Sequence, residues 1–168
     1  MDKKNQQQFF EDVIEQHKGI LFKVAKTYCR NDDDRQDLVQ EMMIQIWRSL
    51  HRYNNQFAIT TWLYRVSLNV AISFYRKNST KQNLRVPLID EVLLIQNPKP
   101  FEREEQLELL DQFISELNDF DRALMLLYLE DKSHAEISEI IGISVTNVGT
   151  KLGRIKEKLK KKFSLINK

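Results

Sequence analysis

The sequence predicts an all-α protein in which two small helical domains are joined by a flexible linker. Its 168 residues include only 4 glycines and 3 prolines, a composition that favours helices over sheets. Apolar residues recur at intervals of three and four along most of the chain, which is the period of an α-helix. All three prolines lie between Val86 and Phe101, where this period is lost. We therefore expect a linker over residues 78–101, between domains 1–77 and 102–168.

Three helices are expected in the first domain and four in the second. Apolar residues mark the first helix from Phe10 to Tyr28 and the second from Leu38 to Leu50. The segment "NDDDRQD" before the second helix supplies side chains that cap a helix N-terminus. A third helix is expected over residues 62–77. The expected helices of the second domain are Glu104–Leu117, Asp121–Glu130, Ser133–Ile141 and Val145–Phe163.

The segment "SHAEISEIIGIS" predicts a helix-turn-helix. Ser133 and Glu136 have the spacing of a capping box. Gly142 follows the apolar stripe where a helix C-cap needs positive φ, and Ser144 can cap a second helix directly afterwards. Together these signals favour a helix-turn-helix, whose second helix enters the DNA major groove, over a plain helical hairpin.

The second helix of this motif has an apolar stripe and an opposite polar face. Asn147, Thr150, Lys151 and Arg154 share the polar face, and such side chains bind base edges or phosphates. The lysines that follow suit phosphate attraction, although a run of lysines is also common on a solvated surface.

Gly149 and Gly153 lie one turn apart at the border between the stripe and the polar face. An interior glycine costs about 1 kcal/mol relative to alanine. The sequence does not decide between two roles for these glycines. They could permit close approach of a neighbouring helix or a phosphate, or they could keep the helix only marginally stable until it binds DNA.

One face of the third helix carries Trp62, Arg65, Asn69, Ser73 and Arg76. An aromatic ring, two cations and an amide on one strip suit single-stranded or melting DNA, where bases stack and phosphates attract cations. The preceding segment "HRYNNQF" adds a basic, aromatic and amide-rich loop. Taken alone, an aromatic residue such as Trp62 is more often a core or surface residue than a base-stacking one.

On the second helix, Ile44 faces away from the apolar stripe, among Asp37, Gln40, Glu41 and Arg48. A single exposed isoleucine is common on protein surfaces. An apolar side chain ringed by charges is also typical of a partner-binding patch.

The chain shows no pattern of a catalytic or metal site. His17, His51, His134 and Cys29 are scattered without metal-ligand spacing, and no glycine-rich phosphate loop is present. We predict no catalytic residue, no metal and no cofactor. A single cysteine cannot form an internal disulfide, and no apolar run approaches the roughly 18 residues of a membrane helix. A cytoplasmic protein without membrane insertion is expected.

Three segments together resemble a bacterial RNA polymerase sigma factor of the extracytoplasmic-function (ECF) group. "DRQDLVQEMMIQIWRSL" resembles the polymerase-binding helix of that family, "TTWLYRVSLNVAISFYRK" its promoter-melting helix, and "DKSHAEISEIIGISVTNVGTKLGRIKEKLK" its helix-turn-helix. Their order and the linker length agree with the family. The resemblance implies a transcription initiation factor that binds core RNA polymerase and directs it to specific promoters. The resemblance also implies an anti-sigma factor as a possible partner, because members of the family commonly have one, although no residue of this chain indicates it.

Residues at matching positions take the family's roles by resemblance. Core polymerase binding falls on Asp37, Gln40, Glu41, Ile44 and Arg48. Recognition and melting of the minus-ten promoter element fall on Tyr53, Asn54, Asn55, Phe57, Thr61, Trp62, Arg65, Asn69 and Arg76. Binding of the minus-thirty-five element falls on Ser144, Thr146, Asn147, Thr150, Lys151 and Arg154.

The sequence departs from the family pattern at several positions. Ser73 stands where the family commonly has aspartate, and Ser138 replaces a small alanine of the helix-turn-helix. We expect Ser138 to be tolerated if its hydroxyl bonds back to its own helix. Gly149 and Gly153 replace commonly basic or polar residues, which weakens the minus-thirty-five assignment.

Two other classes of protein compete with the sigma-factor interpretation. A stand-alone helix-turn-helix regulator of duplex DNA explains the second domain but leaves the Trp62 strip and the Ile44 patch without a role. The second alternative is a helical adaptor whose basic tail binds partners or RNA.

Overall fold

The structure is a computed structural model that describes residues 2–82 and 103–166. Within these ranges every regular element is a helix, which confirms the all-α prediction. The elements in chain order are α1 (Lys3–Tyr28), α2 (Asp32–Ser49), the short 3-10 helix η1 (Leu50–Arg52), α3 (Ile59–Gln82), α4 (Arg103–Ser115), α5 (Asp119–Leu129), α6 (His134–Ile141) and α7 (Val145–Ile166). In the part of the chain described, no helix has the length and hydropathy needed to cross a bilayer.

The first part of the expected linker is helical. Residues 78–82 continue α3 beyond its expected end at residue 77, and the remaining linker positions to residue 101 lie outside the described residues. Helix α3 also begins earlier than expected, at Ile59. The polar residues at its C-terminal end carry no apolar stripe that could have indicated this length.

Asparagine side chains start two of the helices. The Oδ1 atom of Asn31 accepts a hydrogen bond from the backbone N–H of Asp34 at 2.7 Å, at the N-terminus of α2. Asn118 does the same for Asp121 at 2.8 Å, so α5 begins at Asp119 and not at the expected Asp121. Such a cap satisfies one of the N–H groups that a helix N-terminus leaves unpaired.

The helix-turn-helix has the caps that the sequence predicts. The Ser133 hydroxyl accepts from the Glu136 N–H at 3.1 Å, and the Ser133 N–H donates to the Glu136 carboxylate at 2.7 Å. The backbone hydrogen bond from Ser133 lowers the pKa of Glu136. Gly142 has φ +83°, in the left-handed region, and the Ser144 hydroxyl accepts from the Asn147 N–H at 3.1 Å. These contacts end α6 at Ile141 and start α7 at Val145, with three residues between the two helices.

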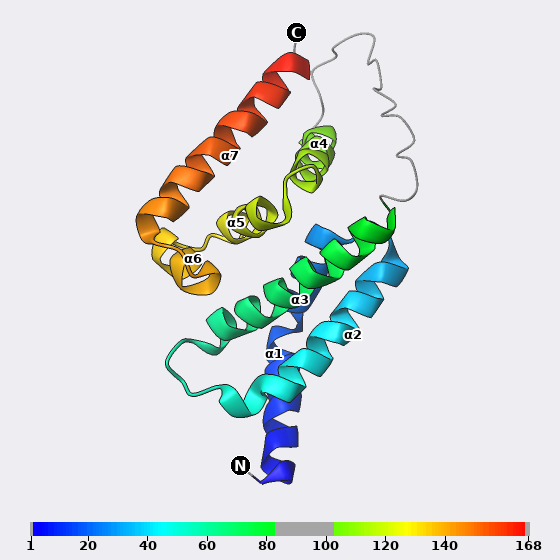
Figure 1. The fold of residues 1–168 in the computed structure, drawn as a ribbon, viewed down its shortest axis with the longest axis vertical. Coiled ribbons are helices and arrows are strands. Elements are labelled where there is room, and N and C mark those ends of the chain that lie inside the picture. Colours follow the sequence, from blue (N-terminus) through cyan, green and yellow to red (C-terminus); the bar gives the residue numbers. More distant parts are fainter. Residues whose placement is uncertain (1, 83–102, 167–168) are drawn as a thin grey trace.

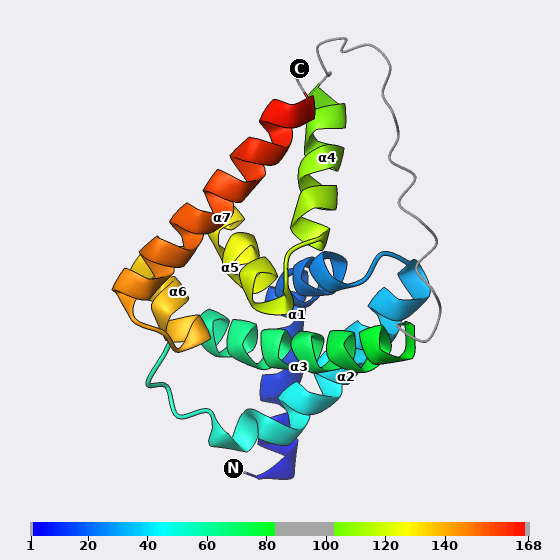
Figure 2. The same cartoon turned by 45° about the horizontal axis from the view of Figure 1, so that its top comes forward.

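Helix α3 is central to the arrangement of the others. It packs against α1 and α2, and it also contacts α5 and α6 from the C-terminal half. Figures 1 and 2 show α2 on one side of α3 and the pair α5 and α6 on the other. Helix α4 packs on α5 and α7, and α7 packs on α5 and α6. The two halves of the chain therefore meet along α3 and α1.

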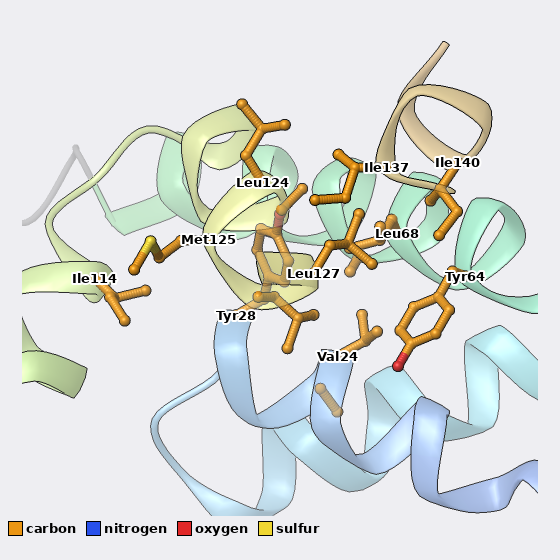
Figure 3. Packing of buried hydrophobic residues seen from close by; sticks show 14 of the residues in the cluster. Val24, Tyr28, Tyr64, Leu68, Ile114, Leu124, Met125, Leu127, Ile137 and Ile140 are labelled. Atoms are coloured by element: carbon orange, nitrogen blue, oxygen red, sulfur yellow. The ribbon is translucent and has the colours of Figure 1, made fainter. Parts of the chain in front are cut away.

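Buried side chains from both halves form one apolar cluster. Figure 3 shows the zone where they meet, which includes Val24, Tyr28, Tyr64 and Leu68 from the N-terminal half and Leu124, Leu127, Ile137 and Ile140 from the C-terminal half. Leu127 and Ile137 are fully buried. Burying a side chain of this size stabilises the fold by about 1.5–3 kcal/mol. The contact between the halves is therefore a true apolar interface, and no sequence pattern indicated it.

Two glycines of the helix-turn-helix should respond oppositely to alanine. Gly153→Ala should raise the free energy of unfolding by about 0.5–1 kcal/mol, because alanine is the better helix former and nothing lies within 4 Å of the added Cβ. Gly142→Ala should lower it by about 1 kcal/mol or more, because a side chain strains the left-handed backbone. Chemical denaturation measures both changes. A less stable Gly153→Ala protein would contradict the expectation.

Candidate functional site

The polar face of α7 is largely open to solvent. Ser144, Thr146, Asn147, Thr150 and Arg154 are exposed, whereas Lys151 is half-buried. Ser144 is already used as the helix cap, and the Thr150 hydroxyl donates to the Thr146 carbonyl at 3.1 Å. The ammonium of Lys151 lies 5.4 Å from the centre of the Phe120 ring. Asn147 and Arg154 are thus the side chains of this face best placed to meet a base edge.

The two glycines of α7 have different surroundings in the structure. A Cβ on Gly149 would lie 3.6 Å from the His134 ring of α6, an ordinary van der Waals distance, whereas a Cβ on Gly153 would meet nothing within 4 Å. Gly149 therefore borders the neighbouring helix, although alanine would fit there. Neither glycine is required by close packing.

Ser138 connects α6 to the turn. Back-bonding to its own helix was the condition under which this serine was expected to be tolerated. Its hydroxyl instead donates to the Ile143 carbonyl at 2.5 Å. The residue that departs from the family pattern thus closes the turn between α6 and α7. Its bonding partner could not be read from helical spacing, because Ile143 lies beyond the glycine that ends the helix.

The residues around Ile44 border a groove between α2 and α3. Ile44 is 40% exposed, and Asp37, Gln40, Glu41 and Arg48 are also exposed. The groove has a volume of about 680 Å³; its lining includes Asp37, Gln40, Glu41 and Ile44 on α2, and Val66, Asn69, Val70 and Phe74 on α3. The patch predicted on α2 is thus accessible and continues onto α3. Asn69, assigned to the minus-ten element, borders this same groove.

Aromatic side chains cluster in the loop before α3 and at the start of that helix. The rings of Tyr53 and Trp62 lie 5.4 Å apart, centre to centre, and the Tyr53 hydroxyl donates to the Phe57 carbonyl at 3.0 Å. Asn55 has φ +61°, and the Asn54 side chain accepts a hydrogen bond from the Gln56 N–H at 3.2 Å. Both asparagines are exposed. Trp62 is half-buried.

Thr61 does not belong to this loop. It lies in the first turn of α3 and is 7% exposed. The helix expected over residues 62–77 would have left Thr61 just before its start, but α3 begins at Ile59. Its burial leaves little of its side chain for contact with a ligand.

The two arginines of the α3 strip contact the C-terminal half of the chain. Arg65 donates from Nε to the Glu139 carbonyl of α6 at 2.6 Å, and its guanidinium lies 4.2 Å from the centre of the Phe57 ring. Arg76 donates from Nε to the Asp119 carboxylate of α5 at 2.5 Å, which raises the pKa of Arg76. The structure therefore brings together the Trp62 strip and the helix-turn-helix half, which sequence reasoning treated as separate.

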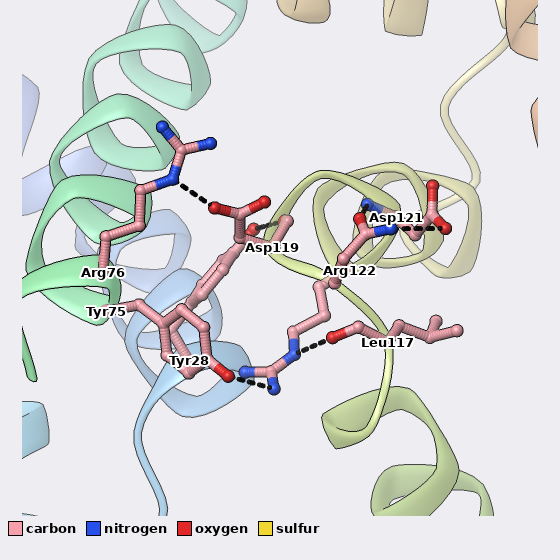
Figure 4. Close-up of polar contacts among 8 residues, drawn as sticks. Tyr28, Tyr75, Arg76, Leu117, Asp119, Asp121 and Arg122 are labelled. Carbon is pink, nitrogen blue, oxygen red and sulfur yellow. Dashed lines mark hydrogen bonds and ion pairs between the residues drawn. The ribbon is translucent and has the colours of Figure 1, made fainter. Parts of the chain in front are cut away.

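A buried arginine connects the same two halves. Arg122 of α5 is 5% exposed. It donates to the carbonyls of Leu117 and Ser115 and to the Tyr75 hydroxyl of α3, and its guanidinium lies 4.4 Å from the centre of the Tyr75 ring. Figure 4 shows Tyr28 and Asp119 beside it. Sequence reasoning missed this residue, although an arginine inside the apolar run "RALMLLYL" was a usable signal.

Tyr28 completes this cluster from α1. Its hydroxyl donates to the Asp119 carbonyl at 2.5 Å, and burial raises the pKa of Tyr28 far above the usual tyrosine range. A cavity of about 830 Å³ lies beside the cluster, with walls that include Tyr28 and Cys29 from α1 and its end, and Arg122 and Leu126 from α5. Burial raises the pKa of the Cys29 thiol to about 11.

Two family descriptions match this chain in order. Sigma-70 region 2 matches residues 13–81, and Sigma-70 region 4 matches residues 107–159. The chain belongs to the sigma-70 family of RNA polymerase sigma factors and is of the ECF type. It is a transcription initiation factor that directs RNA polymerase to promoters, as the resemblance implied.

Similar proteins cover nearly the whole chain. The ECF RNA polymerase sigma factor SigM of Bacillus subtilis (strain 168) is 25% identical over 151 residues, with 89% of this chain and 92% of SigM covered. SigW of the same organism is 26% identical over 172 residues, covering 96% and 92%. The sigma factor RpoE of Bartonella quintana, solved in complex with the anti-sigma factor NepR, has a TM-score of 0.66 at 18% identity, covering 94% and 96%. At that identity the likeness shows the fold alone.

Replacing Arg122 tests how much the buried guanidinium contributes to the fold. Arg122→Met should lower the free energy of unfolding by about 2–4 kcal/mol, because buried carbonyls lose their donor. Arg122→Lys should lower it less, since lysine keeps the charge but lacks the fork that reaches several acceptors. Arg103→Met, on the exposed start of α4, is the surface control. Urea denaturation of the three variants measures the difference, and an Arg122→Met protein as stable as the parent would contradict it.

Proposed function

We propose that this sigma factor binds polymerase and promoter DNA through three separate surfaces. The exposed patch on α2 around Ile44 binds core RNA polymerase. The loop from Tyr53 to Phe57 and the strip on α3 recognise and open the minus-ten element. The polar face of α7 binds the minus-thirty-five element. The protein acts in the bacterial cytoplasm, where the polymerase works, and carries out no catalysis of its own.

The accessible patch on α2 is the observation that best supports polymerase binding. Ile44 is 40% exposed beside a groove lined by charged, amide and apolar side chains. This combination of a central apolar contact with a polar rim is typical of protein interfaces. The patch lies on α2, away from the helix-turn-helix (Figure 2), so DNA binding through that motif alone would leave it without a role.

The DNA surfaces suit different forms of DNA. Helix α7 presents Asn147 and Arg154 along one exposed face, as a reading helix in a major groove requires. The Tyr53–Trp62 pair offers aromatic rings beside cations, which suits unpaired bases. Each surface is small, so affinity for a promoter arises when polymerase fixes both surfaces on one DNA molecule. The free protein should therefore bind promoter duplex weakly.

We also propose an anti-sigma factor as a partner, because RpoE of Bartonella quintana was solved with one. A segment placed in the groove between α2 and α3 would compete with polymerase for Ile44. Competition between a co-expressed candidate and core polymerase would test this pairing.

Titration against core RNA polymerase and against promoter-like duplex DNA tests the proposed function. Fluorescence of the labelled protein should report tight binding to polymerase and weak binding to duplex alone. Salt-sensitive duplex binding without any polymerase affinity would instead identify a stand-alone regulator.

Ile44→Asp should weaken polymerase binding by at least about tenfold, because it places a charge in the apolar centre of the interface. Ile44→Val, which keeps an apolar side chain at the same place, is the matched control and should bind within about twofold of the parent. The same titration measures both variants. If the aspartate variant binds polymerase as the parent does, the patch is not the docking surface.

Arg154→Ala should cost about 1–3 kcal/mol in binding of the preferred promoter and relax the preference at one base pair, if Arg154 contacts a base edge. Lys160→Ala, in the lysine run of α7, should weaken all sequences equally and reduce the salt dependence. Binding by the polymerase-bound protein to a set of single-base promoter variants separates the two patterns. A sequence-independent loss for Arg154→Ala would make it a phosphate contact.

A further inference from the structure

A phenylalanine of α1 packs against the loop assigned to the minus-ten element. The ring of Phe9 lies 6.4 Å from the ring of Tyr53, centre to centre, and the two ring planes are 20° apart. This is the geometry of a stacked aromatic pair. Tyr53 in turn lies 5.4 Å from Trp62, near the start of α3. The three rings therefore form a row that joins α1, the loop and α3, and Figures 1 and 2 show the start of α1 and this loop at the same end of the molecule.

Tyr53 connects this aromatic row to the rest of the loop. Its backbone N–H donates to the Leu50 carbonyl at 3.1 Å, and its hydroxyl donates to the Phe57 carbonyl at 3.0 Å. The hydroxyl contact joins the two ends of the loop, and Asn54 and Asn55 are exposed between them. The position of the Tyr53 ring therefore determines where both asparagines lie.

Phe9 is itself held in a well-supported part of α1. The helix begins at Lys3, so Phe9 lies about two turns inside it, beyond the end that frays. A side-chain hydrogen bond from Gln7 to Glu11, at 3.0 Å, supports the helix around Phe9. Val13, one turn further on, is buried in the apolar core. The ring of Phe9 is thus fixed relative to the core before it meets the loop.

We propose that Phe9 is a positioning residue for recognition of the minus-ten element; this rests on the proposed function of the loop from Tyr53 to Phe57. Phe9 acts through Tyr53 and needs no contact with DNA. A loop that moves freely must lose conformational freedom when it binds, and a loop held in its binding position avoids part of that cost. The stack on Phe9 holds the loop in this way.

The neighbouring residue supplies a matched control. Phe10 has the same side chain as Phe9, and both are half-buried against the apolar core. Phe10 instead packs edge-on against Trp47 of α2, with the ring centres 5.3 Å apart and the planes at 82°. The same substitution at the two positions therefore removes a ring from the loop in one variant and a ring from α2 in the other.

The test is the promoter selectivity of core polymerase saturated with each full-length variant. A preferred minus-ten sequence is first selected from a randomised element. Opening of this promoter and of its single-base variants is then followed by the fluorescence of 2-aminopurine placed in the element. Phe9→Leu should lower the preference for the selected sequence by about twofold to tenfold, the range of an aromatic pair, because a substituted promoter already lacks the loop contact. A protein that is only less stable would open all of these promoters less, in the same proportion.

Two further variants show whether the ring and its position matter. Phe9→Tyr keeps the aromatic ring and should keep the parent's preference. Phe10→Leu should leave the preference unchanged, because its ring does not support the loop. Equal loss of preference in Phe9→Leu and Phe10→Leu would overturn the inference.

Dependence on Tyr53 identifies the route by which Phe9 acts. In a Tyr53→Ala protein, Phe9→Leu should have no further effect on the preference, as expected of two residues that act together. A further loss in that background, or an unchanged preference in Phe9→Leu while Tyr53→Ala alone lowers it, would also overturn the inference. If Tyr53→Ala itself leaves the preference unchanged, the loop does not read the minus-ten element, and the proposed function fails first.

The support that Phe9 gives can also be measured without polymerase or DNA. The chain has two tryptophans, so Trp47→Phe leaves Trp62 as the sole tryptophan. In this background, acrylamide should quench Trp62 faster after Phe9→Leu, because a loosened loop exposes the indole ring more often. Phe10→Leu should leave the quenching rate unchanged. Unchanged quenching in Phe9→Leu would show that the ring does not hold the loop, whatever the promoter assays show.

Discussion

The buried guanidinium of Arg122 is the interaction on which the arrangement of the two halves depends. A charge at 5% exposure is costly unless every donor finds an acceptor. Its partners come from both sides of the interface: the carbonyls of Leu117 and of Ser115, the last residue of α4, and the Tyr75 hydroxyl of α3. The apolar cluster around it supplies most of the stabilising free energy. The arginine favours this placement of α5 on α3, because another register would cost the guanidinium its contact with the Tyr75 hydroxyl and ring.

Helix α3 therefore has two roles that conflict. Its buried residues, such as Leu63 and Leu68, make it the central helix of the packed chain. Its polar strip carries Trp62, Arg65, Asn69 and Arg76, which we propose to bind the minus-ten element. In the packed form the arginines of that strip are bound by α5 and α6. Contacts within the protein and the proposed contacts with promoter DNA thus use the same two arginines.

Much of the candidate site was predictable wherever the determining contacts are local. The capping box of Ser133, the left-handed Gly142 and the Ser144 cap each depend on residues within three positions, and the structure has all of them. The start of α5 at Asn118 was missed although its signal was equally local. Thr61 lies inside α3 because the helix begins at Ile59, three residues before the expected start at residue 62. Lys151 is half-buried and lies near the Phe120 ring, which no periodic pattern connects to α7.

The sequence by itself determined the helices, the helix-turn-helix and the sigma-factor family. Helical periodicity and caps are properties of short segments, and they survive in any arrangement of those segments. Only the tertiary structure decided which predicted residues are accessible. Arg65 and Arg76 are held by residues 74 and 43 positions away in the chain. Contacts at such separations depend on how whole helices pack, and a helical wheel shows which face a residue shares but not what covers that face.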